Sequence, residues 1–222
     1  MKGEKIMTMK EFEKYSGIKF TVNHTGKMEG IISISTSCLC NPFCQARMKN
    51  PNSICSKCYS AAMHKRYSNL AKMLAKNFEI LTSKLFEIDE FPFIPNSLCR
   101  IESFGDIYNV TQARNYLRLI KANPQTFFAF FTKNFNILAQ AIAIEGKPEN
   151  MNVILSNELV NDFDHYSAYL DFSFCDIQFN VYDKVNAKSV DINCGLRKCV
   201  ECRFCYTPKR FKSRRVVNEI LK

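Results

Sequence analysis

The sequence predicts an α/β protein built on a parallel sheet, and two observations carry that prediction. Segments with strand-like and helix-like patterns alternate along the chain of 222 residues. Seven glycines and seven prolines are spread without any low-complexity stretch, so no linker is indicated. Alternating strands and helices are typical of βαβ units around a parallel sheet.

The first predicted elements follow a charged amino-terminal stretch. Residues 30–36, Gly-Ile-Ile-Ser-Ile-Ser-Thr, are β-branched and bounded by turn formers, which indicates a strand that leads directly into a group of cysteines. Between 60 and 85, apolar residues recur every three or four positions. This spacing predicts an amphipathic helix whose core-facing stripe includes Met63 and Tyr67.

The rest of the chain repeats the alternation. We expect strands at 98–103, 126–132, 152–156 and 177–182, and helices at 110–121 and 134–144. The predicted architecture is therefore a parallel sheet, open or partly closed as a partial (β/α) barrel. Ligands of such sheets bind at the carboxyl ends of the strands.

We predict a single domain over residues 1–222. It is divided into an N-terminal segment, 1–30, an α/β core, 31–182, and a Cys-rich and basic C-terminal segment, 183–222. An apolar share of 46% is sufficient for a hydrophobic core. A chain of this size does not depend on disulfides, and its start shows no apolar signal region. No apolar run is long enough to span a bilayer, so we expect a cytoplasmic protein with reduced cysteines and no membrane partner.

The last group of cysteines is the most specific chemical signal. It consists of Cys194, Cys199, Cys202 and Cys205. Structural zinc typically takes its ligands as two separated pairs, whereas a two-residue spacing repeated in tandem is typical of a loop around a [4Fe–4S] cluster. The spacing favours iron–sulfur, with a zinc knuckle as the alternative.

The leading group contains Cys38, Cys40, Cys44, Cys55 and Cys58, one thiol more than a four-thiolate site needs. Cys44, Cys55 and Cys58 are the firmest ligands. We assign Cys40 as the fourth, with Cys38 as the alternative. If only three thiolates bind, one iron keeps an open position for a substrate or cosubstrate, and the cluster becomes reactive.

Other chemistry has little support in the sequence. The three histidines are scattered, and none pairs with a cysteine at metal-finger spacing. No nucleophile elbow, zincin motif or dinucleotide fingerprint is present, so ordinary hydrolases and dehydrogenases are not indicated.

The charge of the chain suggests an acidic partner. Lysine and arginine exceed aspartate and glutamate by ten, which favours nucleic acid or another acidic partner. The excess is densest at 209–215, and Tyr206 and Phe211 beside it are candidates to stack on bases. The alternative is a solvated, lysine-rich surface.

Five segments occur in an order that resembles a known family. They are Asn41-Pro-Phe-Cys44, Cys55-Ser-Lys-Cys58-Tyr-Ser60, Arg100-Ile-Glu-Ser-Phe-Gly-Asp106, Phe130-Phe-Thr-Lys133 and Cys194-Gly-Leu-Arg-Lys-Cys-Val-Glu-Cys-Arg-Phe-Cys-Tyr206. Together they resemble the phage gene product 88 family over about residues 30 to 206. The resemblance implies a bacteriophage or prophage origin, and hence the cytoplasm of a bacterial host, and assigns no reaction.

A more distant likeness is to the radical S-adenosylmethionine enzymes, which carry a three-cysteine cluster after their first barrel strand and a Gly-Gly-Glu-like motif after the second. Here the second strand ends in Ser103-Phe-Gly105-Asp106. The likeness implies that Ser103, Gly105 and Asp106 bind S-adenosylmethionine, with Gly105 allowing close approach and Asp106 bonding its amino group. It also implies that residues 132–134 lie near the same edge.

Two observations weigh against carrying that likeness further. Ten residues separate Cys44 from Cys55, whereas those enzymes usually space their cysteines by three and then two. Gly105 and Asp106 are equally typical of a tight turn in which the aspartate caps the helix that starts near Val110.

Two functional hypotheses result. The first is a phage iron–sulfur protein with a radical-S-adenosylmethionine-like core and one or two [4Fe–4S] clusters. The second is a metal-stabilised phage protein that binds host nucleic acid or a host nucleic-acid-handling or defence complex without catalysis. Purely structural metals are compatible with either.

Overall fold

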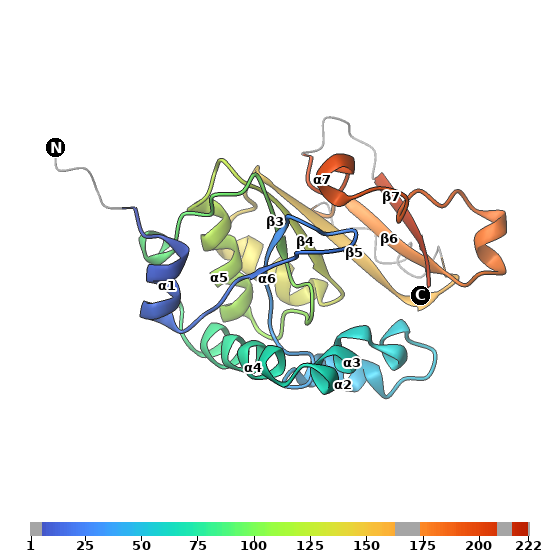
Figure 1. Cartoon of the computed structure of the whole chain (residues 1–222), viewed down its shortest axis with the longest axis horizontal. Coiled ribbons are helices and arrows are strands. Elements are labelled where there is room, and N and C mark those ends of the chain that lie inside the picture. Colours follow the sequence, from blue (N-terminus) through green and yellow to red (C-terminus); the bar gives the residue numbers. More distant parts are fainter. Residues whose placement is uncertain (1–5, 163–173, 208–214, 222) are drawn as a thin grey trace.

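The computed structural model describes residues 6–162, 174–207 and 215–221. Within these residues, seven strands form one open sheet in the order β1-β2-β3-β4-β5-β6-β7 (Figure 1). The strands are β1 (Thr21–Val22), β2 (Ile32–Ile34), β3 (Leu98–Ile101), β4 (Phe127–Thr132), β5 (Met151–Val160), β6 (Ile177–Tyr182) and β7 (Arg215–Ile220). β1 is antiparallel to β2, and every later pair of neighbours is parallel.

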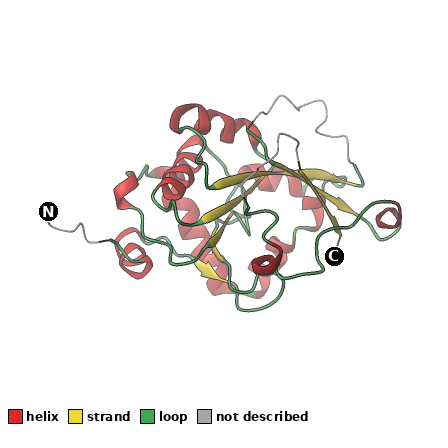
Figure 2. Ribbon diagram, turned by 90° about the horizontal axis from the view of Figure 1, so that it is seen from above, coloured by secondary structure: helices red, strands yellow, loops and turns green. Residues whose placement is uncertain are grey.

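Helices flank the twisted sheet (Figure 2). They are α1 (Met9–Ser16), α2 (Pro42–Met48), α3 (Tyr59–Arg66), α4 (Ser68–Ser83), α5 (Val110–Lys121), α6 (Phe135–Glu145) and α7 (Cys199–Cys202). Short 3₁₀ turns lie at η1 (Ile54–Lys57), η2 (Ile88–Glu90) and η4 (Asn186–Ser189). No helix in the described ranges is both long and apolar enough to cross a membrane.

The predicted α/β class and mostly parallel sheet are confirmed. The strand order follows the chain order without a reversal, and α5 and α6 cross over from β3 to β4 and from β4 to β5. The sheet is not closed, because β1 and β7 remain at its two edges.

The single predicted helix at 60–85 is wrong in one respect, because the chain forms two helices there. Tyr67 separates α3 from α4 with non-helical backbone angles, and its side chain is 44% exposed instead of lying in the core. The ring of His64 fixes α3 against the loop after β2, where Ser37 contacts it. α4 instead packs through Leu74 and Leu81. Because α3 packs on the loop after β2 and α4 packs on the core, the chain turns between the two helices.

The first thirty residues carry elements that the sequence analysis did not assign. Thr8 and Glu11 form a capping box at the start of α1, and Gly17 ends the helix with a φ of 78°. Phe12 is fully buried, and its ring contacts those of Phe20, Phe86 and Phe91. The segment therefore contributes directly to the core.

The carboxyl-terminal segment also contains an unassigned strand, β7, which pairs with β6 over its whole length. Most of the basic run at 209–215 lies outside the described residues, which resume at Arg215.

The two faces of the sheet have different covers, because successive residues of a strand point to opposite sides. On the helix-covered face, strand residues pack with α1, α4, α5 and α6; these strand residues are Ile32, Ile34, Cys99, Ile101, Phe128, Phe130, Val153 and Leu155. On the cysteine-covered face, Tyr206 and three terminal cysteines pack against Ile31, Leu98, Ala129, Ile154, Ile177 and Val217. Figure 1 shows α7 beside β6 and β7.

Candidate metal centres

The leading cysteine group lies over the carboxyl ends of β3, β4 and β5. The Asn41 side chain donates to the carbonyl of Asp106 at 2.7 Å, and the hydroxyl of Ser60 donates to the carbonyl of Phe104. Ser53 forms an isolated bridge to Leu159 at the end of β5. This placement confirms that the first strand leads into the cysteine group at the carboxyl edge of the sheet.

Four thiols of this group lie close enough to influence one another. Cys38 shares a thiol hydrogen bond with Cys58, and electrostatic interactions link Cys38 to Cys44 and Cys44 to Cys55. The hydrogen bond from Cys38 lowers the pKa of Cys58 to about 6, aided by the backbone N–H groups of Ser60 and Ala61 and against the effect of burial. Cys58 is therefore the thiol of this pair that ionises more readily, and the thiolate is the form that metals bind.

Cys40, the assigned fourth ligand, has a different environment. Cys40 is exposed, whereas Cys38 is only 2% exposed. The hydroxyl of Ser37 accepts hydrogen bonds from the backbone N–H groups of Leu39 and Cys40 and also contacts Nε2 of His64 at 3.0 Å. This turn brings Cys38 toward Cys58, so the geometry favours the alternative assignment of Cys38, while the ligand role of Cys40 stays a prediction.

His64 is a positioning residue of the leading loop. Its Nδ1 atom contacts the carbonyl of Ser60 at 2.7 Å and its Nε2 atom contacts Ser37, so both ring nitrogens are engaged. The side chain is buried.

The residues expected to bind S-adenosylmethionine are tied to neighbouring strands. The carboxylate of Asp106 accepts hydrogen bonds from the N–H of Ile107 at 2.8 Å, the hydroxyl of Thr132 at 2.5 Å and the N–H of Lys133 at 2.8 Å. Residues 132–134 therefore do lie near this edge, as expected. The helix cap expected from Asp106 is wrong, because Asn109 caps α5 by accepting from the N–H of Gln112.

Gly105 is required by packing within the chain. A Cβ atom there would lie 2.7 Å from the carbonyl oxygen of Thr36. Ser103 is also buried, with its N–H donating to Ser35 and its hydroxyl to Ser33. The contacts of all three residues are therefore with the carboxyl edge of the sheet itself. The binding of S-adenosylmethionine by Ser103, Gly105 and Asp106 stays a prediction.

The terminal cysteine group lines a cavity of about 370 Å³ on the cysteine-covered face. All four predicted ligands, Cys194, Cys199, Cys202 and Cys205, belong to its wall. The backbone holds them in place: Cys199 N–H donates to the carbonyl of Lys27 at 2.7 Å, and Asn152 donates to the carbonyl of Cys205 at 2.9 Å. The structure brings together the residues that the sequence spacing grouped.

Cations face this cavity. The ammonium of Lys27 lies 3.6 Å from the sulfur of Cys194 and 2.5 Å from the carboxylate of Glu219. Burial raises the pKa of Cys205 to about 12 and also raises that of Cys199, while Arg100 opposes both rises. The buried thiols are neutral by themselves, and ionised thiolates here require a further positive charge.

Both groups supply the donor chemistry of a soft metal centre. All eleven cysteines are free thiols, and thiolates are the ligands of zinc and of iron–sulfur clusters. As they stand, no three or more of the described His, Cys, Asp or Glu side chains have converged to hold one metal ion. Loading a metal would therefore draw the sulfurs together and release their protons.

Two residues of the nucleic-acid hypothesis have structural roles instead. Tyr206, expected to stack on bases, is 3% exposed and packs in the core of the cysteine-covered face. The guanidinium of Arg215 donates to the carbonyls of Phe204 at 2.8 Å and Thr207 at 2.9 Å. The prediction that Tyr206 stacks on bases is therefore wrong. Phe211, the other candidate, lies outside the described residues.

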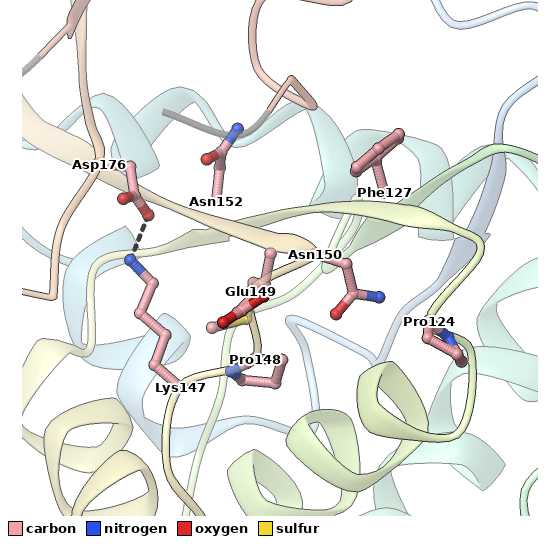
Figure 3. A pocket seen from close by; sticks show the side chains of 9 residues that line it. Pro124, Phe127, Lys147, Pro148, Glu149, Asn150, Asn152 and Asp176 are labelled. Atoms are coloured by element: carbon pink, nitrogen blue, oxygen red, sulfur yellow. Dashed lines mark hydrogen bonds and ion pairs between the residues drawn. The ribbon is translucent and has the colours of Figure 1, made fainter. Parts of the chain in front are cut away.

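A larger cavity, of about 680 Å³, opens at the amino ends of β4 and β5. Figure 3 shows Lys147 reaching Asp176 across it, at 2.6 Å. Lys147 also donates to the carbonyl of Phe174, and Asp176 accepts from the N–H of Val153. The charges of Lys147 and Asp176 are therefore paired with each other, and both side chains are also hydrogen-bonded to the backbone.

The chain is thus an α/β protein with an open, mostly parallel sheet. It carries one group of thiols at the carboxyl edge of that sheet and another on one of its faces. The family model described as Gene product 88 matches residues 13–208, and the chain therefore belongs to the gene product 88 family. This membership supports a bacteriophage origin. Comparison with curated proteins and with solved structures gave no match.

Proposed function

We propose that the chain is a phage iron–sulfur protein that holds one [4Fe–4S] cluster on the terminal group and a second on the leading group. The observation that carries the proposal is the shared cavity of Cys194, Cys199, Cys202 and Cys205. Four thiols around one space of that size, on a loop with tandem two-residue spacing, suit a cluster better than the separated knuckles of structural zinc.

The leading group supports a second centre with a different role. Its thiols lie at the carboxyl edge of the sheet, where α/β proteins bind their ligands. The ring of Tyr59, next to Cys58, is 61% exposed, so this edge is reachable from solvent. In this proposal Cys38, Cys44 and Cys58 hold the cluster, Cys55 completes it, and any reaction takes place here.

A partial barrel and S-adenosylmethionine chemistry are the finer parts of the proposal. Six parallel strands in chain order are the arrangement from which a (β/α) barrel is built. The internal bonding of Asp106 argues against its predicted role toward the amino group of S-adenosylmethionine. We therefore rest cosubstrate binding on the leading cluster itself, where an iron opens when the cosubstrate displaces the fourth thiolate, that of Cys55.

Anaerobic purification tests the proposal, with iron and sulfide analysis, absorption and electron paramagnetic resonance. We expect close to eight irons per chain, and about four in the Cys199→Ser/Cys205→Ser variant or in the Cys44→Ser/Cys58→Ser variant. Cys99→Ala is the matched control, because Cys99 is buried in the opposite face and should leave the iron content unchanged. A colourless protein with stoichiometric zinc would reject the iron–sulfur proposal.

The S-adenosylmethionine part has its own test. The reduced, cluster-loaded protein is incubated with S-adenosylmethionine, and its reductive cleavage is followed by chromatography. An intact cluster without cleavage would reject radical chemistry and leave cluster binding standing. Host nucleic acid or a host protein complex as partner stays a prediction, supported by the net charge of +10.

A further inference from the structure

Arg100 is a cation on the cysteine-covered face of the sheet. It belongs to β3, and its guanidinium lies 3.8 Å from the centre of the Phe131 ring. One terminal nitrogen contacts the sulfur of Met28 at 3.6 Å. The Nε atom is buried without a hydrogen-bond partner.

No carboxylate in the described part of the chain forms an ion pair that balances this charge. Among the described residues, none of the ion pairs includes Arg100. An unpaired charge in a partly buried site is costly, because the lost hydration is not replaced. An aromatic face and a thioether compensate only a small part of that loss.

The groups around Arg100 that are able to carry negative charge are two terminal thiols and the hydroxyls of Tyr59 and Tyr206, of which the thiols ionise more readily. Arg100 acts electrostatically on Cys199 and Cys205. The strand register agrees, because Arg100 pairs with Ala129 and Ala129 with Asn152, the residue that holds the Cys205 carbonyl. Ala129 packs beneath the same cysteines. Lys27, the other half-buried cation of the site, already has Glu219 as its partner.

A loaded terminal centre would supply the missing negative charge. Four thiolates contribute four negative charges, and either Zn²⁺ or a [4Fe–4S] core of charge +2 leaves a net charge of −2. We propose that Arg100 is the half-buried counter-ion of the terminal centre, a positioning residue that stabilises its anionic state. This inference rests on the proposed function and adds to it the residue that sets the charge of the centre.

The test compares Arg100→Met and Arg100→Lys with wild type, and Arg66→Met serves as the control because Arg66 is an exposed arginine on α3. Loss of metal to a chelator is measured on the loaded proteins. We expect Arg100→Met to lose terminal metal about 10- to 100-fold more readily, as is usual for residues that support metal ligands. Arg100→Lys keeps the charge and should stay near wild type. If the centre is a cluster, its reduction potential should fall in Arg100→Met, because the reduced state carries more negative charge.

A second measurement separates a counter-ion from a merely structural residue. In the metal-free proteins, Arg100→Met should unfold at a higher temperature than wild type, because it removes an unpaired, partly buried charge. A residue that acts only by packing on Phe131 would instead lower stability in both the loaded and the metal-free protein.

The failures are distinguishable. Equal metal loss in Arg100→Met, Arg100→Lys and wild type would overturn the role of Arg100 and leave the metal centre intact. Equal loss of metal in the Met and Lys variants would show that charge is not the relevant property. Absence of metal from reconstituted wild type would overturn this inference and the proposed function together.

Discussion

Cys38 and Cys40 are two residues apart and have opposite surroundings. Cys38 is 2% exposed and its thiol is hydrogen-bonded to Cys58, whereas Cys40 is exposed. We expect Cys38→Ser to remove the leading cluster and Cys40→Ser to retain it, because a buried ligand cannot be replaced by one that points to solvent. Iron content and the paramagnetic resonance spectrum of each variant measure the outcome.

The two variants control each other, since each removes one thiol from the same turn. Retention of iron in Cys38→Ser together with its loss in Cys40→Ser would restore the original assignment of Cys40.

Glu102 is a buried acid at the end of β3. Its carboxylate accepts hydrogen bonds from Tyr116 at 2.6 Å, Thr36 at 2.7 Å and Gln112 at 2.8 Å. Burial raises the pKa of Glu102 to about 7, and these hydrogen bonds oppose the rise. Because the folded-state pKa exceeds the ordinary value of 4.5, the folded protein holds the proton more tightly than the unfolded chain does.

Stability from Glu102 is therefore complete below pH 4.5 and is lost as the pH rises to about 7. We expect the free energy of unfolding of wild type, minus that of Glu102→Gln, to fall by about 3 kcal/mol across this window. Urea unfolding of the metal-free proteins at several pH values measures the difference. The exposed Glu79→Gln is the control, and a difference that stays flat with pH would contradict the assignment.

At the scale of elements, α1 shows how the amino-terminal stretch joins the core. Phe12 is fully buried among three other rings. We expect Phe12→Ala to lower the free energy of unfolding by about 3–5 kcal/mol, because it leaves a cavity in an aromatic cluster. Urea unfolding measures this.

Phe93→Ala is the matched control for that substitution, since Phe93 is 42% exposed. It should change the stability much less. Equal small effects of the two substitutions would mean that α1 does not stabilise the sheet.

Elements with a strong periodic pattern were predictable from the sequence, and those with a mixed composition were not. The helix at 110–121 and the strand at 177–182 occur with the predicted bounds. α1 was missed because Phe12 is a single anchor within a charged stretch. β7 was missed because its apolar residues follow a basic run that resembles a solvated tail. The break at Tyr67 depends on contacts of His64 with a distant loop, which periodicity does not record.

The same division applies to the candidate site, where features with a local sequence pattern were predictable and those that depend on distant contacts were not. Spacing grouped the terminal cysteines that line one cavity, because residues a few positions apart in one loop remain close in space, while their binding of a metal stays a prediction. The counter-ion role proposed for Arg100 had no sequence signal, since it depends on parallel pairing between strands far apart in the chain. The internal use of Asp106 was also unpredictable, because its partners belong to β4 and the turn after it.

At the scale of the whole molecule, the two cysteine groups are attached to the sheet in different ways. The leading loop has its own polar anchors, which include Asn41, Ser60 and His64. The terminal loop instead covers an apolar sheet face with its cysteines and Tyr206. Its backbone is hydrogen-bonded to Lys27, Asn152 and Arg215.

Metal removal should therefore act unequally on the fold. Loss of the terminal centre frees the loop that covers Ile154, Ile177 and Val217, and exposes their apolar surface. We expect Cys199→Ser/Cys205→Ser to lower the unfolding temperature of the loaded protein clearly more than Cys44→Ser/Cys58→Ser does. Circular dichroism measures the unfolding temperature, and hydrogen exchange should show lost protection in β5, β6 and β7 and not in β2. A larger effect of the leading variant, or exchange spread evenly over the sheet, would mean that the carboxyl-edge centre holds the fold and the terminal centre does not.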